Sequence, residues 1–276
     1  MDPALDAYLQ QVAAGLGRAL GPVLAGLYLH GSAALGGWSA ARSDVDLLGV
    51  VARPLGRRAK RVAAARLLHP AVVCPAAGGL ELSLVTAAVA ADPPRRPPFE
   101  LHVNTALEGA RHHLGGPGAV DPDLLLDFAV CRRAGVAVRG APPAEVFASP
   151  PRAWLLAQAA EELRWALQHR GFTCRVLTAC RAWRLLEDGE LGSKLDGGEW
   201  ARRRLMRPDQ PVGGLAGGSA PSVRGVPRTP PADPALVDAA PAAQRGLAPA
   251  PGAAADLAAA DRFGAMVLGR FPEADR

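Results

Sequence analysis

The sequence predicts an α+β protein of two domains. We expect a mixed β-sheet flanked by helices over residues 1–148 and an α-helical bundle over residues 149–276. Short apolar segments with strand-like alternation stop at the Ser-Pro-Pro of residues 149–151, and segments with helical spacing follow. At 276 residues, the chain is long enough to build two hydrophobic cores.

Composition argues against a membrane or secreted protein. The longest apolar runs are broken by Arg, Pro or Asp and fall short of the ~20 residues that a membrane helix needs. The N-terminus opens with acidic residues where a leader would be basic and then hydrophobic, and the four cysteines form no CxxC pair. We therefore expect a cytoplasmic protein with reduced, buried thiols.

The formal net charge of +5 does not by itself indicate a nucleic-acid partner. The basic residues are spread along the chain, and we interpret the two short clusters at 57–61 and 202–204 as solvated helix faces. Nucleic acid is therefore not the partner that we expect.

The first domain begins with a helix and two strands. Apolar residues fall on one stripe of residues 5–20, which indicates an amphipathic helix that covers the sheet. Residues 27–30 and 44–51 are short apolar runs that predict two strands, joined by the glycine-rich segment 31–43.

A basic segment, 56–68, predicts the next helix, which crosses over to a strand at 80–86 with the alternating sequence LELSLVT. The proline-rich residues 92–98 predict an extended loop, and residues 99–106 a further strand. After Asp121-Pro122-Asp123, which has the pattern of a helix start, we expect a helix that ends at Gly135 and a last short strand at 136–139.

Three histidines of this domain are not expected to act chemically. We interpret His102 as a polar strand position because no nucleophile is apparent beside it. His112 and His113 are adjacent, so their side chains face apart, and we interpret them as loop residues without a shared metal.

The second domain is predicted to be helical. Apolar residues recur at helical spacing in the segments 152–168, 175–187, 199–205, 235–245 and 253–271. We interpret Trp154, Trp165 and Trp183 as core anchors. A Pro/Gly-rich insertion at about 208–233 is expected to be disordered or loosely packed.

Two aspartates on the second strand indicate a metal site. Side chains alternate along a strand, so Asp44 and Asp46 point the same way while Val45 points into the core. Two carboxylates held so close repel each other unless a cation lies between them, and Mg²⁺ with a phosphate substrate suits oxygen ligands. The alternative is an edge strand whose acids are only solvated.

Gly31 and Ser32 favour the site over that alternative. Glycine permits close backbone approach or positive φ, and Ser32 supplies a hydroxyl and an amide where a short helix begins. On the alternating strand 80–86, Glu81 is the candidate for a third acid, although an exposed strand glutamate is the ordinary interpretation of such a residue.

An apolar strand, Gly-Ser, eleven residues and then Asp-Val-Asp-Leu resembles the signature of the DNA polymerase β-like nucleotidyltransferase superfamily. Within it, the order of motifs resembles the aminoglycoside 3''- and 9-adenylyltransferases, which join a nucleotidyltransferase domain to a helical bundle. The segments with this resemblance are LHGSA, SDVDLL, LELSLV, FEL, DPDL, VLTACRAW and GSKLDGGEW.

The resemblance implies that AMP is transferred from ATP to a hydroxyl of an aminoglycoside antibiotic, which would give resistance. It implies that Mg²⁺ binds to Asp44, Asp46 and Glu81, and that Glu81 is also the base. It further implies ATP-binding residues, namely Gly31, Ser32, Ser43, Asp123, Arg181 and Lys194. For Asp123, a purely structural role at the helix N-terminus is the alternative.

The acceptor is expected to be a small cationic molecule. Members that modify streptomycin have a tryptophan near the position of Ala106 and an acid near residues 169–173, and this chain has neither. The resemblance therefore implies a preference for spectinomycin or a similar compact aminocyclitol. The candidate acceptor-binding residues are Glu100, Glu161 and Glu162.

The sequence is also compatible with two other functions. The chain is expected to act as a monomer on a small molecule, but a transferase acting on a protein or RNA has the same chemistry. A relative that binds ATP without turnover is a further alternative, which the complete set Asp44, Asp46 and Glu81 disfavours.

Overall fold

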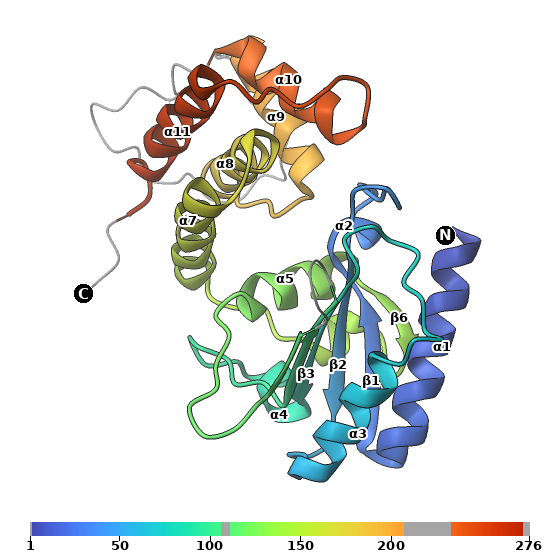
Figure 1. Cartoon of the computed structure of the whole chain (residues 1–276). Coiled ribbons are helices and arrows are strands. Elements are labelled where there is room, and N and C mark those ends of the chain that lie inside the picture. The colour runs from blue at the N-terminus through green and yellow to red at the C-terminus, as the bar shows by residue number, and fades with distance from the viewer. Residues whose placement is uncertain (1, 106–110, 207–232, 273–276) are drawn as a thin grey trace. The chain divides into compact units, whose positions relative to one another are not determined.

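The computed structural model describes residues 2–105, 111–206 and 233–272 of the chain. It forms two compact units, Met1–Pro151 and Arg152–Arg276 (Figure 1). The first contains a sheet and the second is helical, so the predicted α+β class is confirmed. Among the described residues, no helix is long and apolar enough to cross a membrane.

The sheet of the first unit has six strands in the order β5-β4-β3-β2-β1-β6. The strands are β1 (Leu24–Leu29), β2 (Val45–Val51), β3 (Leu80–Thr86), β4 (Leu101–Asn104), β5 (Arg111–Leu114) and β6 (Val136–Arg139). Only β2 and β3 pair in parallel, because a helix joins them as a crossover, and the other four pairings are antiparallel. The sheet is therefore mixed, as predicted.

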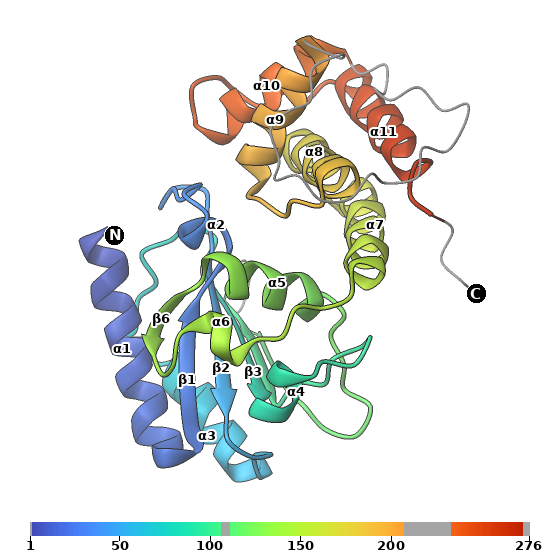
Figure 2. The same ribbon diagram turned by 180° about the vertical axis from the view of Figure 1, so that it is seen from behind.

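Helices cover both faces of this sheet (Figures 1 and 2). The helices of the first unit are α1 (Pro3–Leu20), the 3-10 turn η1 (Gly21–Val23), α2 (Gly31–Ala34), α3 (Arg57–Leu67), α4 (Ala87–Ala91), α5 (Leu124–Ala134) and α6 (Pro143–Val146). On one face, α1 and α3 pack on Leu27, Leu47 and other members of the larger apolar cluster. On the other, α5 packs on Tyr28 and Leu48, which belong to a smaller cluster. Alternation along each strand produces this division.

The prediction for His112 and His113 was wrong, because both lie on β5. This edge strand pairs only with β4, and three of its four residues are exposed. A strand without a buried face shows no apolar alternation, so its sequence does not reveal it. Residues 106–110, which precede β5, lie outside the described part.

The described residues of the second unit, 152–206 and 233–272, form five helices. They are α7 (Arg152–His169), α8 (Phe172–Asp188), α9 (Lys194–Met206), α10 (Pro234–Gln244) and α11 (Ala254–Leu268). The central helix is α8, which packs against α7, α9, α10 and α11. The expected Pro/Gly-rich insertion lies almost wholly outside the described residues.

The core of the second unit contains Trp183, as predicted, with Trp200 and Phe263 against its ring. Trp165 is not a core anchor, since it is 47% exposed. Its indole stacks on His169, four residues along the same helix, and the Arg170 guanidinium lies 4.7 Å from the ring centroid. Helical spacing alone did not distinguish this solvent-facing tryptophan from a buried one.

Candidate active site

Four polar residues stand in a row across the sheet. The backbone N–H of His30, directly after β1, donates to the carbonyl of Asp46 at 3.0 Å. Asp46 on β2 is the register partner of Glu81 on β3, and Glu81 is the register partner of Asn104 on β4. Register partners point to the same side of a sheet, so this row lies on the face that α5 covers.

Three carboxylates converge at this row. One oxygen each of Asp44, Asp46 and Glu81 lies within 4.8 Å of the other two. Asp44 immediately precedes β2, and so the Asp-Val-Asp alternation places both aspartates on the side of Glu81. Hard carboxylate oxygens at this spacing fit Mg²⁺, whose charge would relieve their mutual repulsion.

Gly31 packs directly against this cluster. Its φ is +60°, and a Cβ atom added there would lie 1.7 Å from Asp46 Oδ2. Only glycine satisfies both conditions. The following hydroxyl, Ser32 Oγ, is buried and has no hydrogen-bond partner among the residues that the structure describes. An unsatisfied donor that directly follows Gly31 in the chain is suited to an oxygen-rich ligand such as a phosphate.

Ser43 has a local structural role. It is buried, and its Oγ accepts a hydrogen bond from the Ser39 backbone N–H at 3.1 Å. Its carbonyl accepts from the Gly78 N–H at 2.9 Å. Ser43 thereby fixes the loop that leads into Asp44. The structure thus gives Ser43 a contact other than the phosphate that the resemblance implies.

Further acids lie on and before α5. Asp121 Oδ1 accepts from the Asp123 N–H at 3.0 Å, as expected at a helix start, and Asp123 itself makes no side-chain cap to α5. One turn later, Asp127 Oδ1 lies 3.9 Å from His30 Nδ1. Burial and then the charge of Glu81, among other carboxylates, hold the pKa of Asp127 well above its usual value.

Burial alone lowers the pKa of His30 to about 3, so this imidazole is neutral at physiological pH. The His30 ring therefore adds no positive charge beside Asp127, and the field in this part of the first unit is negative. No sequence pattern singled out His30 or Asp127 as site residues. The spacing of four between Asp123 and Asp127, which places them on one helix face, was an available signal.

A hydroxyl does lie beside His102, contrary to the sequence interpretation. Ser83 Oγ and His102 Nδ1 are 2.9 Å apart on neighbouring strands. Ser83 is buried, and burial also lowers the pKa of His102. This pair satisfies two polar groups inside the fold, so His102 remains a polar strand position.

Glu100 does not join the acidic cluster. Its backbone N–H bonds to the Leu84 carbonyl, so it lies near the other end of β3 from Glu81. Its carboxylate accepts from Lys60 Nζ at 2.9 Å and from the Leu55 N–H at 2.8 Å. Lys60 is buried, so the prediction that residues 57–61 are simply a solvated face is wrong at this position.

In the second unit, the structure brings Glu162, Arg181 and Lys194 together. Arg181 Nη2 donates to both carboxylate oxygens of Glu162. Burial by itself would raise the pKa of Glu162, but the charges of Arg181 and Lys194 outweigh burial and lower it. Lys194 Nζ also lies 3.8 Å from Cys174 Sγ. Glu161 is separate from this cluster and pairs with Arg164 at 2.8 Å, exposed to solvent.

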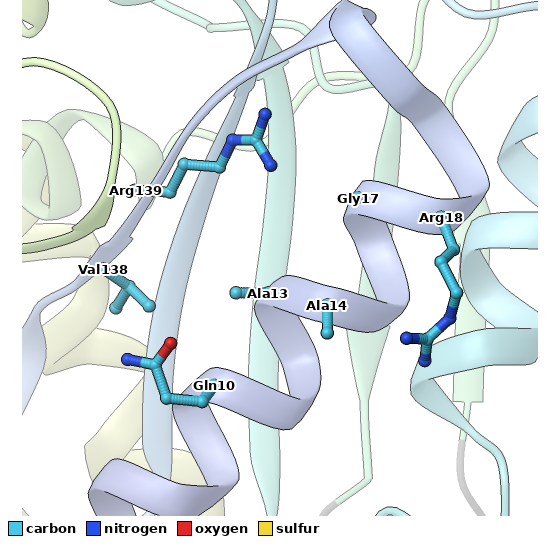
Figure 3. Close-up of a pocket in the computed structure, with 7 residues that line it drawn as sticks. All are labelled: Gln10, Ala13, Ala14, Gly17, Arg18, Val138 and Arg139. Atoms are coloured by element: carbon cyan, nitrogen blue, oxygen red, sulfur yellow. The ribbon is translucent and has the colours of Figure 1, made fainter.

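A shallow pocket lies elsewhere on the first unit, between α1 and β6 (Figure 3). Its lining includes Gln10, Gly17, Arg18 and Arg139. None of the predicted site residues contributes to this pocket. It is therefore not the site that the sequence predicts.

Part of the chain matches a known protein family, and its fold resembles a solved structure. Residues 153–215 match the family described as "Aminoglycoside adenylyltransferase, C-terminal domain". The solved structure of spectinomycin adenyltransferase AAD(9) from Enterococcus faecialis, with ATP and spectinomycin, has a TM-score of 0.65 at 14% identity. That alignment covers 96% of this chain and 98% of the other. No curated protein sequence matches the chain.

At this identity, the structural likeness shows a shared fold. The family match lies in the second unit, over a range that contains Glu162, Arg181 and Lys194. Together, the two findings indicate a nucleotidyltransferase. The resemblance predicted from the sequence is thereby confirmed.

Proposed function

We propose that this protein transfers AMP from ATP to a hydroxyl of an aminoglycoside or aminocyclitol antibiotic, with Mg²⁺. The main observation in support is the convergence of Asp44, Asp46 and Glu81 beside Gly31 and Ser32. The matched C-terminal domain family supports the acceptor class. The related fold whose structure contains ATP and spectinomycin is consistent with both substrates.

In the proposed reaction, an acceptor hydroxyl attacks the α-phosphorus of ATP. A new oxygen–phosphorus bond forms, the bond to the β-phosphate oxygen breaks, and pyrophosphate leaves. The Glu81 carboxylate takes the hydroxyl proton. Asp44, Asp46 and Glu81 would hold Mg²⁺, which would supply positive charge against the charge that develops on the phosphate oxygens.

The remaining residues bind and orient ATP in this proposal. The Ser32 hydroxyl, which has no hydrogen-bond partner in the described part of the chain, donates to a phosphate oxygen. Arg181 and Lys194 supply positive charge to the triphosphate and the departing pyrophosphate. Asp123 contacts the nucleotide. Ser43 acts less directly, by fixing the loop before Asp44.

The acceptor is proposed to be cationic because the first unit presents a negative field at the metal site. The pKa of Asp127 is raised by burial and then by the charges of Glu81, Asp123, Asp46 and Asp121, in that order. A polycationic antibiotic would be attracted to such a surface although the net charge of the chain is +5. Glu100 is not retained as a contact for the acceptor, since it lies near the other end of β3 from Glu81 and is paired with Lys60. Glu162 is retained, although it is paired with Arg181, because it belongs to the cluster that contains Lys194.

The decisive experiment is incubation of the protein with Mg²⁺, α-³²P-labelled ATP and a panel of aminoglycosides and aminocyclitols. We expect a labelled AMP adduct of at least one antibiotic, identified by mass spectrometry, and its loss in Asp46→Asn. If a protein or RNA added in place of the antibiotics became labelled, the proposed AMP transfer would stand but the acceptor would be that macromolecule. ATP binding without transfer to any acceptor would indicate a non-catalytic relative.

We further propose that the protein acts as a cytoplasmic monomer.

A further inference from the structure

Asn104, the last residue of β4, contacts the proposed catalytic base. Its Nδ2 donates a hydrogen bond to Glu81 Oε2 at 3.2 Å. The two residues are register partners on antiparallel strands, so their side chains lie on the same face of the sheet. Neither composition nor motif spacing singled out Asn104, because this contact depends on the register between two strands.

The backbone around this contact is anchored on both sides. Thr105, the next residue, donates its N–H to the Leu80 carbonyl at 2.8 Å, and its Oγ1 accepts from the Leu80 N–H at 2.7 Å. These two bonds tie the end of β4 to the residue that precedes Glu81. The positions of the Asn104 and Glu81 backbones are therefore fixed relative to each other, so the Asn104 amide restricts the rotation of the Glu81 carboxylate.

The orientation of the Glu81 carboxylate matters because this one group has two proposed roles. It is proposed both to bind Mg²⁺ with Asp44 and Asp46 and to accept the proton of the acceptor hydroxyl. A freely rotating glutamate would populate several rotamers, and only some of them direct an oxygen toward the aspartates. A donor that fixes a ligating carboxylate is known to affect metal affinity and activity by about 10–100-fold.

Asn104 is also an uncommon choice for a strand residue. Asparagine is depleted in strands. The next pair of register partners on this face is Ser83 and His102, whose side chains hydrogen-bond to each other inside the fold. Asn104 instead places its amide on a carboxylate that the proposed reaction uses. We propose that Asn104 is a positioning residue, which fixes the orientation of the Glu81 carboxylate for metal binding and proton transfer. This inference rests on the proposed function of Glu81.

The test compares Asn104→Leu, which removes the donor at similar volume, with Asn104→Gln, which restores an amide. Ser83→Ala is the matched control, because it removes a polar group from the same sheet face without touching Glu81. Mn²⁺ binding is measured by electron paramagnetic resonance with α,β-methylene-ATP and the full-length protein. Steady-state kinetics give kcat and the KM for ATP and acceptor, and the melting temperature reports folding.

We expect Asn104→Leu to bind Mn²⁺ about 10-fold more weakly and to lose about 10–100-fold in kcat, with an unchanged melting temperature. The KM for the acceptor should change far less than kcat. Asn104→Gln should recover most of both properties, and Ser83→Ala should keep wild-type Mn²⁺ affinity.

Wild-type Mn²⁺ affinity and kcat in Asn104→Leu would overturn the proposal, and so would equal losses in Ser83→Ala. Failure of Asn104→Gln to recover Mn²⁺ affinity would also count against a positioning role. If the wild-type protein binds Mn²⁺ but modifies no antibiotic, the proposed function fails, and the Mn²⁺ measurements still decide whether Asn104 orients Glu81.

Discussion

Asp46 and Glu81 are register partners on the one parallel pair of strands in the described sheet. Their carboxylates consequently point to the same face, and Asp44 adds a third within 4.8 Å. Three acids held so close without a cation repel one another. The fold therefore maintains an arrangement that is electrostatically unfavourable by itself, which supports the proposed metal site.

Neutralising one of these acids should remove activity without harming the fold. We predict that Asp46→Asn lowers AMP transfer by more than about 100-fold, because metal ligation supplies several kcal/mol to the transition state. The melting temperature in the absence of metal should stay constant or rise, since the repulsion from Asp44 and Glu81 is relieved. Wild-type turnover with Mg²⁺ would show that Asp46 is not a ligand.

Glu81→Gln separates the chemical step from nucleotide binding. The amide keeps the size of the side chain but cannot accept the proton, so we predict a fall in kcat of at least about 100-fold. Calorimetry with α,β-methylene-ATP and Mg²⁺ should still show binding, because Asp44 and Asp46 remain. Unchanged transfer, or a variant that does not fold, would remove Glu81 from the proposed role.

Much of the fold was predictable because its elements have local signals. Alternation predicted β3, and the apolar run after Asp44 predicted β2. The edge strand β5 was missed, since no buried face imposes a pattern on its four residues. Trp165 was misplaced because helical spacing gives the faces of α7 but does not say which one is solvated.

The site was predictable where its residues are close in sequence. Asp44 and Asp46 share a face through alternation alone, and the Gly31-Ser32 turn is contiguous with β1. Contacts across strands were not predictable, because register is set by tertiary pairing. Glu100 was expected to contact the acceptor, yet its backbone bonds to Leu84, whereas Asn104 is the register partner of Glu81.

The partly buried pair of Glu162 and Arg181 predicts a pH-dependent contribution to stability. The net pKa of Glu162 is lowered in the folded state, because the charges of Arg181 and Lys194 outweigh burial. The ionised Glu162 therefore stabilises the fold fully above its usual pKa of 4.5. This stabilisation is lost as the pH falls through the lowered pKa that Glu162 has in the folded state. We predict that Glu162→Gln lowers the free energy of unfolding by about 1–3 kcal/mol at pH 7.

Urea unfolding between pH 3 and pH 8 measures this effect. The difference in unfolding free energy between the wild type and Glu162→Gln should shrink below pH 4.5. Glu161→Gln is the control, because Glu161 is exposed and its surface pair with Arg164 is worth little. A difference that persists unchanged to pH 3 would contradict the assignment.

Lys194 and Arg181 are predicted to differ when each is replaced by alanine. Both variants should weaken binding of α,β-methylene-ATP, since both remove positive charge proposed to face the triphosphate. Lys194→Ala should leave the melting temperature without nucleotide nearly unchanged. Arg181→Ala should lower it, because Glu162 loses the donor to both its oxygens. Wild-type nucleotide affinity in both variants would exclude them from the ATP site.

The last prediction concerns the acceptor, which we expect to be spectinomycin or a similar compact aminocyclitol in preference to streptomycin. The tryptophan of streptomycin-modifying relatives is replaced by Ala106, which lies outside the described residues, and residues 169–173 contain no acid. An acidic cluster beside the metal site remains to attract a cationic acceptor to the first unit. Calorimetric titration of each antibiotic, in the presence of α,β-methylene-ATP and Mg²⁺, compares the two directly. Tight streptomycin binding without spectinomycin binding would reverse the preference, and binding of neither would point to a different hydroxylated acceptor.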